Sequence, residues 1–104
     1  MAEVVELNDD NFDEFVSKGK VVVDFWAAWC GPCQMMKPIF HEAAEEAGKG
    51  IKFGSVNVDE NSEIAQRFQV MSIPTLIFFK DKAPADKSVG VIDKDAILEK
   101  INDL

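Results

Sequence analysis

Apolar positions along the chain fall into blocks whose spacing predicts alternating strands and helices. Strands are predicted over 4–7, 20–27, 51–58, 75–80 and 87–91, the last two forming an antiparallel hairpin joined by a polar link over 81–86. Helices are predicted between them: one that Asn8 can cap and Gly19 can end, one over 33–49, a short one capped by Asn61 or Ser62, and one capped by Asp93. The segment 20–27 is almost continuously apolar, which is typical of a central strand covered on both faces.

This order of elements predicts an α/β fold. Three early strands separated by helices favour parallel pairing, and the closing hairpin adds antiparallel strands, so we expect a mixed central sheet with helices on both faces. The length of 104 residues suits a single domain over 1–104. The strand over 20–27 leads directly into Cys30, and functional sites in open α/β sheets usually lie beyond the carboxyl ends of strands.

The charge balance narrows the possible partners. Eleven Lys and Arg residues against nineteen Asp and Glu residues give a net charge of -8, the wrong sign for binding nucleic acid or anionic lipid. The longest apolar runs are far below the ~20 residues that a membrane helix needs, so no membrane association is expected. Acidic residues near Met1 do not fit a signal peptide, and we therefore expect a cytoplasmic protein.

The two cysteines provide the candidate chemistry. Cys30 and Cys33 are separated by Gly31 and Pro32, at the point where the central strand turns into a helix. Unpaired N–H groups and the helix dipole stabilise a thiolate there, so the pKa of Cys30 is expected to be lowered. Gly31 leaves the turn uncrowded and Pro32 suits a first helical turn, which predicts an open Cys30 and a more covered Cys33. Cys30 can then attack a substrate disulfide, and Cys33 can resolve the mixed disulfide.

Three other interpretations of the pair remain open at this point. A structural disulfide closing so short a loop would add only about 2 kcal/mol. A metal site within one chain lacks ligands, because the only histidine, His41, lies eight residues beyond Cys33, about 12 Å along a helix. The pair could also be buried and inert. His41 itself is expected to be an ordinary surface residue.

The run from Asp24 to Cys33, followed by Pro38, Ile73-Pro74-Thr75 and Gly90, closely resembles the thioredoxin family over nearly the whole chain. The resemblance implies a thioredoxin fold, with Cys30 as nucleophile, Cys33 as resolving thiol and Asp24 as a buried acid/base group. It also implies that reversible oxidation of Cys30 and Cys33 serves in place of a bound cofactor or metal.

The same resemblance assigns the residues around the pair. Trp29 flanks the nucleophile and contacts substrates, Trp26 packs in the core beneath the motif, and Gly31 and Pro32 complete the active-site turn. Pro74 is expected to be cis and to face the cysteines, although most X-Pro bonds are trans. The backbone of Ile73 is then available to an extended substrate segment, and the resemblance assigns Pro74 and Gly90 to substrate binding as well.

Four positions depart from the family pattern. Ser55 stands where a lysine usually accompanies the buried acid, so we expect the pKa of Asp24 to lie above its ordinary value. Gln34 replaces a residue that is often basic, which weakens activation of Cys30. Lys82 replaces the usual glycine of the last hairpin, and Ala28 stands where Glu or Pro is common.

These observations predict a cytoplasmic thiol-disulfide oxidoreductase that reduces protein disulfides and is itself reduced by a reductase of the thioredoxin reductase type. Transient docking favours a monomer. Two alternatives stay open: a disulfide oxidant or isomerase, and a binding subunit that uses the fold without catalysis. Gly31-Pro32 resembles the reducing members, whereas oxidants and isomerases usually have histidine in that dipeptide.

Overall fold

The computed structural model describes residues 3–104. The chain folds in the order β1 (Val4–Leu7), α1 (Phe12–Phe15), β2 (Lys20–Trp26), α2 (Gly31–Ala47), β3 (Ile51–Asn57), α3 (Ser62–Arg67), β4 (Thr75–Lys80), β5 (Ala83–Val89) and α4 (Lys94–Asn102). This is the order that the hydrophobic pattern predicts.

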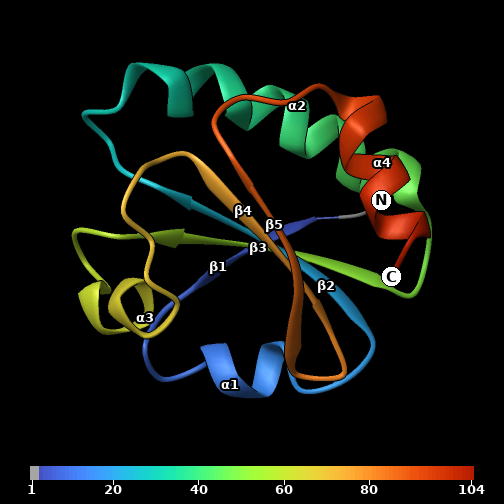
Figure 1. Ribbon diagram of the computed structural model, residues 1–104, viewed down its shortest axis with the longest axis horizontal. Coiled ribbons are helices and arrows are strands. Elements are labelled where there is room, and N and C mark those ends of the chain that lie inside the picture. The colour runs from blue at the N-terminus through green and yellow to red at the C-terminus, as the bar shows by residue number, and fades with distance from the viewer. Residues whose placement is uncertain (1–2) are drawn as a thin grey trace.

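The strands form one mixed sheet in the order β1-β3-β2-β4-β5. Strands β1, β3 and β2 are parallel, whereas β4 runs antiparallel to β2 and β5 antiparallel to β4. Helices α2 and α4 lie on one side of the sheet, and α1 and α3 lie on the other (Figure 1). The predicted mixed α/β sheet, with helices on both faces, is confirmed.

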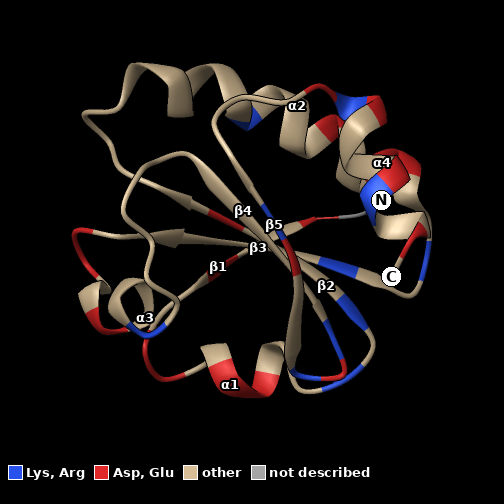
Figure 2. Cartoon of the chain, viewed as in Figure 1, with Lys and Arg blue, Asp and Glu red and all other residues tan. Residues whose placement is uncertain are grey.

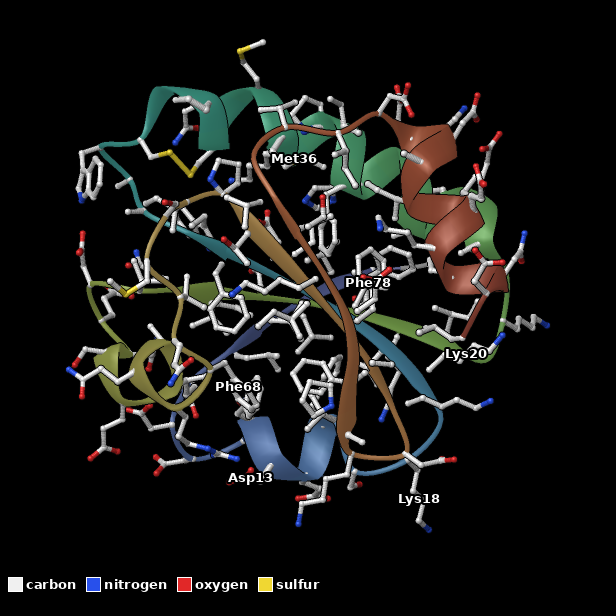
Figure 3. The ribbon with its side chains drawn as sticks, viewed as in Figure 1. Asp13, Lys18, Lys20, Met36, Phe68 and Phe78 are labelled. Atoms are coloured by element: carbon white, nitrogen blue, oxygen red, sulfur yellow. A yellow bond between two sulfur atoms is a disulfide. The ribbon has the colours of Figure 1, made fainter. Side chains whose placement is uncertain are left out.

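Strand β2 occupies the centre of the sheet, and its alternating side chains serve two separate cores. Val21, Val23 and Phe25 pack on the side of α1 and α3, while Val22 packs on the side of α2 and α4. Figure 3 shows Phe68 in the first layer and Met36 and Phe78 in the second. Because side chains alternate along a strand, Asp24 shares the α2 side with Val22.

The first helix begins later than its sequence predicts. Helix α1 is only four residues long and its N-cap is Asn11. Asn8 instead accepts hydrogen bonds at Oδ1 from the backbone N–H groups of Asp10, at 2.8 Å, and Asn11, at 2.9 Å. Asn8 therefore organises the turn before the helix, a role that Asn side chains fill as readily as capping.

The predicted polar link over 81–86 is wrong. Strand β5 begins at Ala83, and only Asp81 and Lys82 separate it from β4. Both turn residues have positive φ, 49° and 78°, as a tight hairpin turn requires. Most of β5 is exposed at the edge of the sheet. Its sequence is therefore polar, like that of a loop. The strand contains Pro84 and is irregularly paired opposite Phe78 and Phe79.

Candidate active site

Cys30 is the N-cap of α2 and thus lies between the end of β2 and the first helical turn. The Cys33 N–H donates to Cys30 Sγ at 3.2 Å. Gly31 and Pro32 form the start of the helix, which begins two residues earlier than the predicted Cys33. Through the cap hydrogen bond and the helix terminus, backbone N–H groups with partial positive charge face the Cys30 sulfur.

Cys30 and Cys33 are joined in a disulfide, with their Cα atoms 5.2 Å apart. The structure therefore represents the oxidised state of the pair. Cys30 is 4% exposed and Cys33 is 2% exposed, so the expected contrast between an open and a covered cysteine is small in this state. Ala27, Trp26, Val58 and Ile73 pack around the two sulfurs and account for the cover over Cys30.

Asp24 is buried at the floor of a pocket of about 330 Å³ that Cys33 also lines. Within the described residues 3–104, its buried Oδ1 has no hydrogen-bond partner. Burial raises the pKa of Asp24 from 3.8 to about 7, because removal from water disfavours the charged form. The raised pKa of Asp24 agrees with the expectation that followed from Ser55 in place of a lysine. A carboxyl group with such a pKa can exchange a proton near neutral pH.

The mouth of this pocket is formed by exposed charged and polar side chains, while its floor is buried. Glu6, Lys37 and His41 stand at the outside, and Ser55 is half-buried on the wall. His41 is exposed as predicted, but the sequence did not indicate that it opens onto Asp24. It lies four residues beyond Lys37 on α2, and side chains at that spacing share a helix face.

The two tryptophans have different environments. Trp29 is 72% exposed, and its Nε1–H donates to Asp59 Oδ2 at 2.9 Å. Trp26 is half-buried rather than fully in the core, because it lines the pocket beside Asp24, and the Lys37 ammonium lies 5.7 Å from the centre of its ring. Asp59 is a site residue that no sequence motif indicates, since an acid after a strand carries no signal by itself.

The Ile73–Pro74 peptide bond is cis, the isomer that the family resemblance implies. Cys30 Sγ lies 3.8 Å from Ile73 O; a disulfide sulfur has no hydrogen to donate, so this is a packing contact. The Gly90 N–H donates to Pro74 O at 2.8 Å, with Gly90 at φ 95°. The fold thus brings the segments around Cys30, Ile73 and Gly90 to one place.

Gln34 lies on the first turn of α2, beside the cysteines. Its side-chain Nε2 donates to the carbonyl of Ala28 at 3.5 Å, which spans the active-site turn. In residues 3–104, no group of three or more His, Cys, Asp or Glu side chains is arranged to hold a metal ion. No helix among the same residues is long and apolar enough to cross a membrane.

The family model described as Thioredoxin matches residues 3–103. A thioredoxin of Staphylococcus haemolyticus is 47% identical over 96 residues, which cover 92% of each chain. A thioredoxin of Bacillus subtilis is 43% identical over 99 residues, which cover 95% of each chain.

Solved structures show the same similarity. A thioredoxin from Malassezia sympodialis superposes with a TM-score of 0.88 at 37% identity, covering 99% of this chain and 91% of the other. A mutant thioredoxin from Halobacterium salinarum gives a TM-score of 0.90 at 33% identity, with 97% and 89% covered.

Proposed function

The chain belongs to the thioredoxin family and is a thiol-disulfide oxidoreductase of the protein-disulfide reductase type; on that premise, we propose which of its residues carry the reaction. Members of this family use a reversible active-site disulfide and no cofactor, and family membership implies protein disulfides as substrates and a reductase as electron donor. One observation chiefly supports these roles: the Cys30–Cys33 disulfide stands at the start of α2, and Cys33 lines the same pocket as the buried Asp24.

Cys30 is the nucleophile in this proposal. In the reduced protein its thiolate attacks one sulfur of the substrate disulfide, which forms a mixed disulfide and releases the other substrate sulfur as a thiolate. The N-cap position supports this role, since partial positive charge at the helix terminus stabilises the attacking anion. The released thiolate takes a proton from solvent.

Cys33 resolves the mixed disulfide. Its thiol gives a proton to the Asp24 carboxylate, and the resulting thiolate attacks Cys30 Sγ. The Cys30–Cys33 bond forms, the bond to the substrate breaks, and the second substrate thiolate leaves and is protonated. The substrate is reduced by two electrons and the protein is oxidised by two. The shared pocket of Cys33 and Asp24 supports the proton transfer.

Four residues around the pair hold the substrate. Trp29 supplies an exposed aromatic surface, and the Ile73 backbone beside Cys30 pairs with an extended segment of the substrate. Pro74 and Gly90 fix this edge through the hydrogen bond between the Gly90 N–H and Pro74 O. Gly31 and Pro32 keep the active-site turn small enough for a substrate backbone to approach.

The chain works as one domain over 1–104, as a monomer that docks transiently, in the cytoplasm. The family match over 3–103 supports one domain. A reducing compartment suits a dithiol that must be returned to its reduced form after each turnover. The proposed electron donor is a separate reductase of the thioredoxin reductase type.

The test is reduction of a disulfide-bonded protein by dithiothreitol, with the native chain, Cys30→Ser and Cys33→Ser. The native chain should accelerate reduction well beyond dithiothreitol alone, and both variants should lose this acceleration. Cys33→Ser should accumulate a mixed disulfide on Cys30, visible by mass spectrometry. Adduct formation on Cys33 in Cys30→Ser, with none in Cys33→Ser, would reverse the two roles.

The redox potential separates a reductant from an oxidant or isomerase. Equilibration against glutathione should show a strongly reducing pair, and a shift of ~30 mV corresponds to about 1.4 kcal/mol. A potential in the range of strong oxidants would contradict the reductase assignment. Activity that survives loss of both cysteines would point to a binding subunit instead.

A further inference from the structure

The surface around the disulfide carries a group of exposed or half-buried apolar side chains, which we call the docking rim: Trp29, Met71, Ile73, Val89 and Val91. Met71 is 92% exposed and Val89 is 58% exposed, although such side chains usually avoid water. Contacts among their segments hold the rim together, because Ile73 O touches Cys30 Sγ and the Gly90 N–H is bonded to Pro74 O. A partner covers this rim when its disulfide reaches Cys30.

The chain segments that form the docking rim and its border carry charge of one sign only. The four segments that form it and its border, 28–34, 57–61, 69–75 and 88–92, contain the acids Asp59 and Glu60 and neither Lys nor Arg. Figure 2 shows acidic residues on the loop between β3 and α3 and no basic residue at the start of α2. The net charge of -8 on the whole chain adds to the negative electrostatic potential around the rim.

Asp59 is held in place beside the rim, and the backbone of Glu60 is fixed in the same turn. Asp59 Oδ2 accepts from Trp29 Nε1–H at 2.9 Å, which ties the carboxylate to the aromatic side chain of the rim. Asn57 Oδ1 accepts from the backbone N–H of Asp59 at 2.9 Å and of Glu60 at 3.4 Å. A charge on a fixed loop keeps its position relative to a docked partner, so its contribution to recognition is not averaged away.

The first cation of α2, Lys37, borders the pocket above Asp24. It lies one turn past the cysteines, with its ammonium 5.7 Å from the Trp26 ring centre. Gln34, which is nearer the disulfide and stands at a position often basic in the family, contributes no charge. The rim therefore presents apolar surface and negative charge together.

We propose that the docking rim selects protein disulfides whose flanking residues are Lys or Arg, with Asp59 and Glu60 as the acids that recognise them and the neutral Gln34 permitting the approach. This inference rests on the proposed reductase function and adds a substrate preference to it. Opposite charges at a rim act mainly on the rate of encounter and on the choice between partners. The preference is therefore expected in second-order rate constants and at low salt.

The experiment uses two disulfide-bonded peptides that differ only in carrying two Lys or two Glu residues beside the cystine. Reduction of each by the reduced full-length protein is divided by its reduction by dithiothreitol, which removes the difference in intrinsic reactivity. The Lys peptide should be reduced about threefold or more faster at low salt. The ratio should fall toward one in 1 M salt, where the screening length is about 3 Å.

Three variants test the assignment to particular residues. Gln34→Lys and Glu60→Gln should each lower the Lys-to-Glu peptide ratio by about twofold. Glu99→Gln removes the same charge from α4, which lies away from the start of α2 in Figure 1, and should leave the ratio unchanged. The ratio cancels any general change in Cys30 reactivity that a charge at position 34 causes.

Equal normalised rates for the two peptides at low salt, or a preference for the Glu peptide, would overturn the inference. So would a preference that Glu60→Gln and Gln34→Lys leave intact, or one that Glu99→Gln lowers as much. Failure to reduce either peptide faster than dithiothreitol would instead count against the proposed function, so the two failures are distinguishable.

Discussion

Asp24 and Ser55 are register partners on the parallel strands β2 and β3, and both line the pocket beneath the disulfide. A residue at position 55 therefore lies next to the buried carboxyl group. In this chain it supplies a hydroxyl group and no charge. The pKa of Asp24 is accordingly raised to about 7 by burial, which disfavours the charged carboxylate.

Substitution Ser55→Lys should lower the pKa of Asp24. An ammonium group within reach of a buried carboxylate stabilises its charged form, and such a partner commonly lowers a carboxyl pKa by about 1–3 units. The measurement is an NMR titration of the Asp24 carboxyl carbon in the oxidised protein. Ser55→Met is the matched control, because it adds a side chain of similar length without charge and should keep the pKa raised. Equal pKa values in the two variants would contradict the expectation.

Asp24 should make the stability of the oxidised protein fall as pH rises. Because the folded pKa of about 7 lies above the unfolded value of 3.8, the folded state holds the proton more tightly. The associated stability is fully present below about pH 3.8 and is lost as pH rises through about 7. The full shift amounts to about 4 kcal/mol, as an order of magnitude.

Asp24→Asn removes this titration. The variant should exceed the native protein in free energy of unfolding by about 2–4 kcal/mol at pH 8, and the gap should narrow as pH falls toward 4. Denaturant unfolding at a series of pH values measures both effects. A gap that stays constant over that range would show that Asp24 titrates alike in the folded and unfolded states.

Lys82→Gly should stabilise the protein by about 1 kcal/mol. Lys82 has φ 78° in the two-residue turn between β4 and β5, a conformation that costs any residue with a Cβ atom and costs glycine little. Lys82→Ala is the control, since it removes the charge but keeps the Cβ atom, and it should give no such gain. Thermal and denaturant unfolding of the three proteins measure the difference. An equal gain of stability in Lys82→Ala would mean that loss of the charge, and not relief of the backbone, causes it.

Gly54→Ala should destabilise the protein by about 1–3 kcal/mol. A Cβ atom at position 54 would stand 2.6 Å from Leu7 Cδ1 and 3.0 Å from Phe15 Cε2, and Leu7 is fully buried and cannot easily retreat. Gly31→Ala serves as the control, because a Cβ atom there meets nothing within 4 Å. The unfolding free energies of both variants are compared with the native value; a loss in Gly31→Ala as large as in Gly54→Ala would contradict the steric cause.

Much of the fold could be predicted because its signals are local. The apolar run of β2 and the cap of α4, where Asp93 Oδ1 accepts from the Ala96 N–H at 2.8 Å, depend on residues adjacent in the sequence. Strand β5 was misplaced because an exposed edge strand needs no apolar alternation. The start of α1 was misplaced because Asn8 can serve a turn as well as a cap.

The features of the site also divide into those that local sequence predicts and those that depend on distant contacts. Cys30 and Cys33 could be identified from their spacing and from the strand that precedes them. The position of His41 at the mouth above Asp24, the bond from Trp29 to Asp59 and the cover over Cys30 depend on contacts between distant segments. No local pattern encodes these contacts, so they emerged only with the tertiary structure.

Strand β5 forms one outer border of the sheet, and its composition discourages a second copy of the chain from joining there. Pro84 lacks the N–H that an added strand would need, and Asp86 and Lys87 are charges that a neighbouring strand would have to accommodate. The irregular pairing opposite Phe78 and Phe79 further disrupts a straight template. Growth of the sheet by edge-to-edge pairing of copies is therefore disfavoured, and we expect the protein to resist aggregation at high concentration.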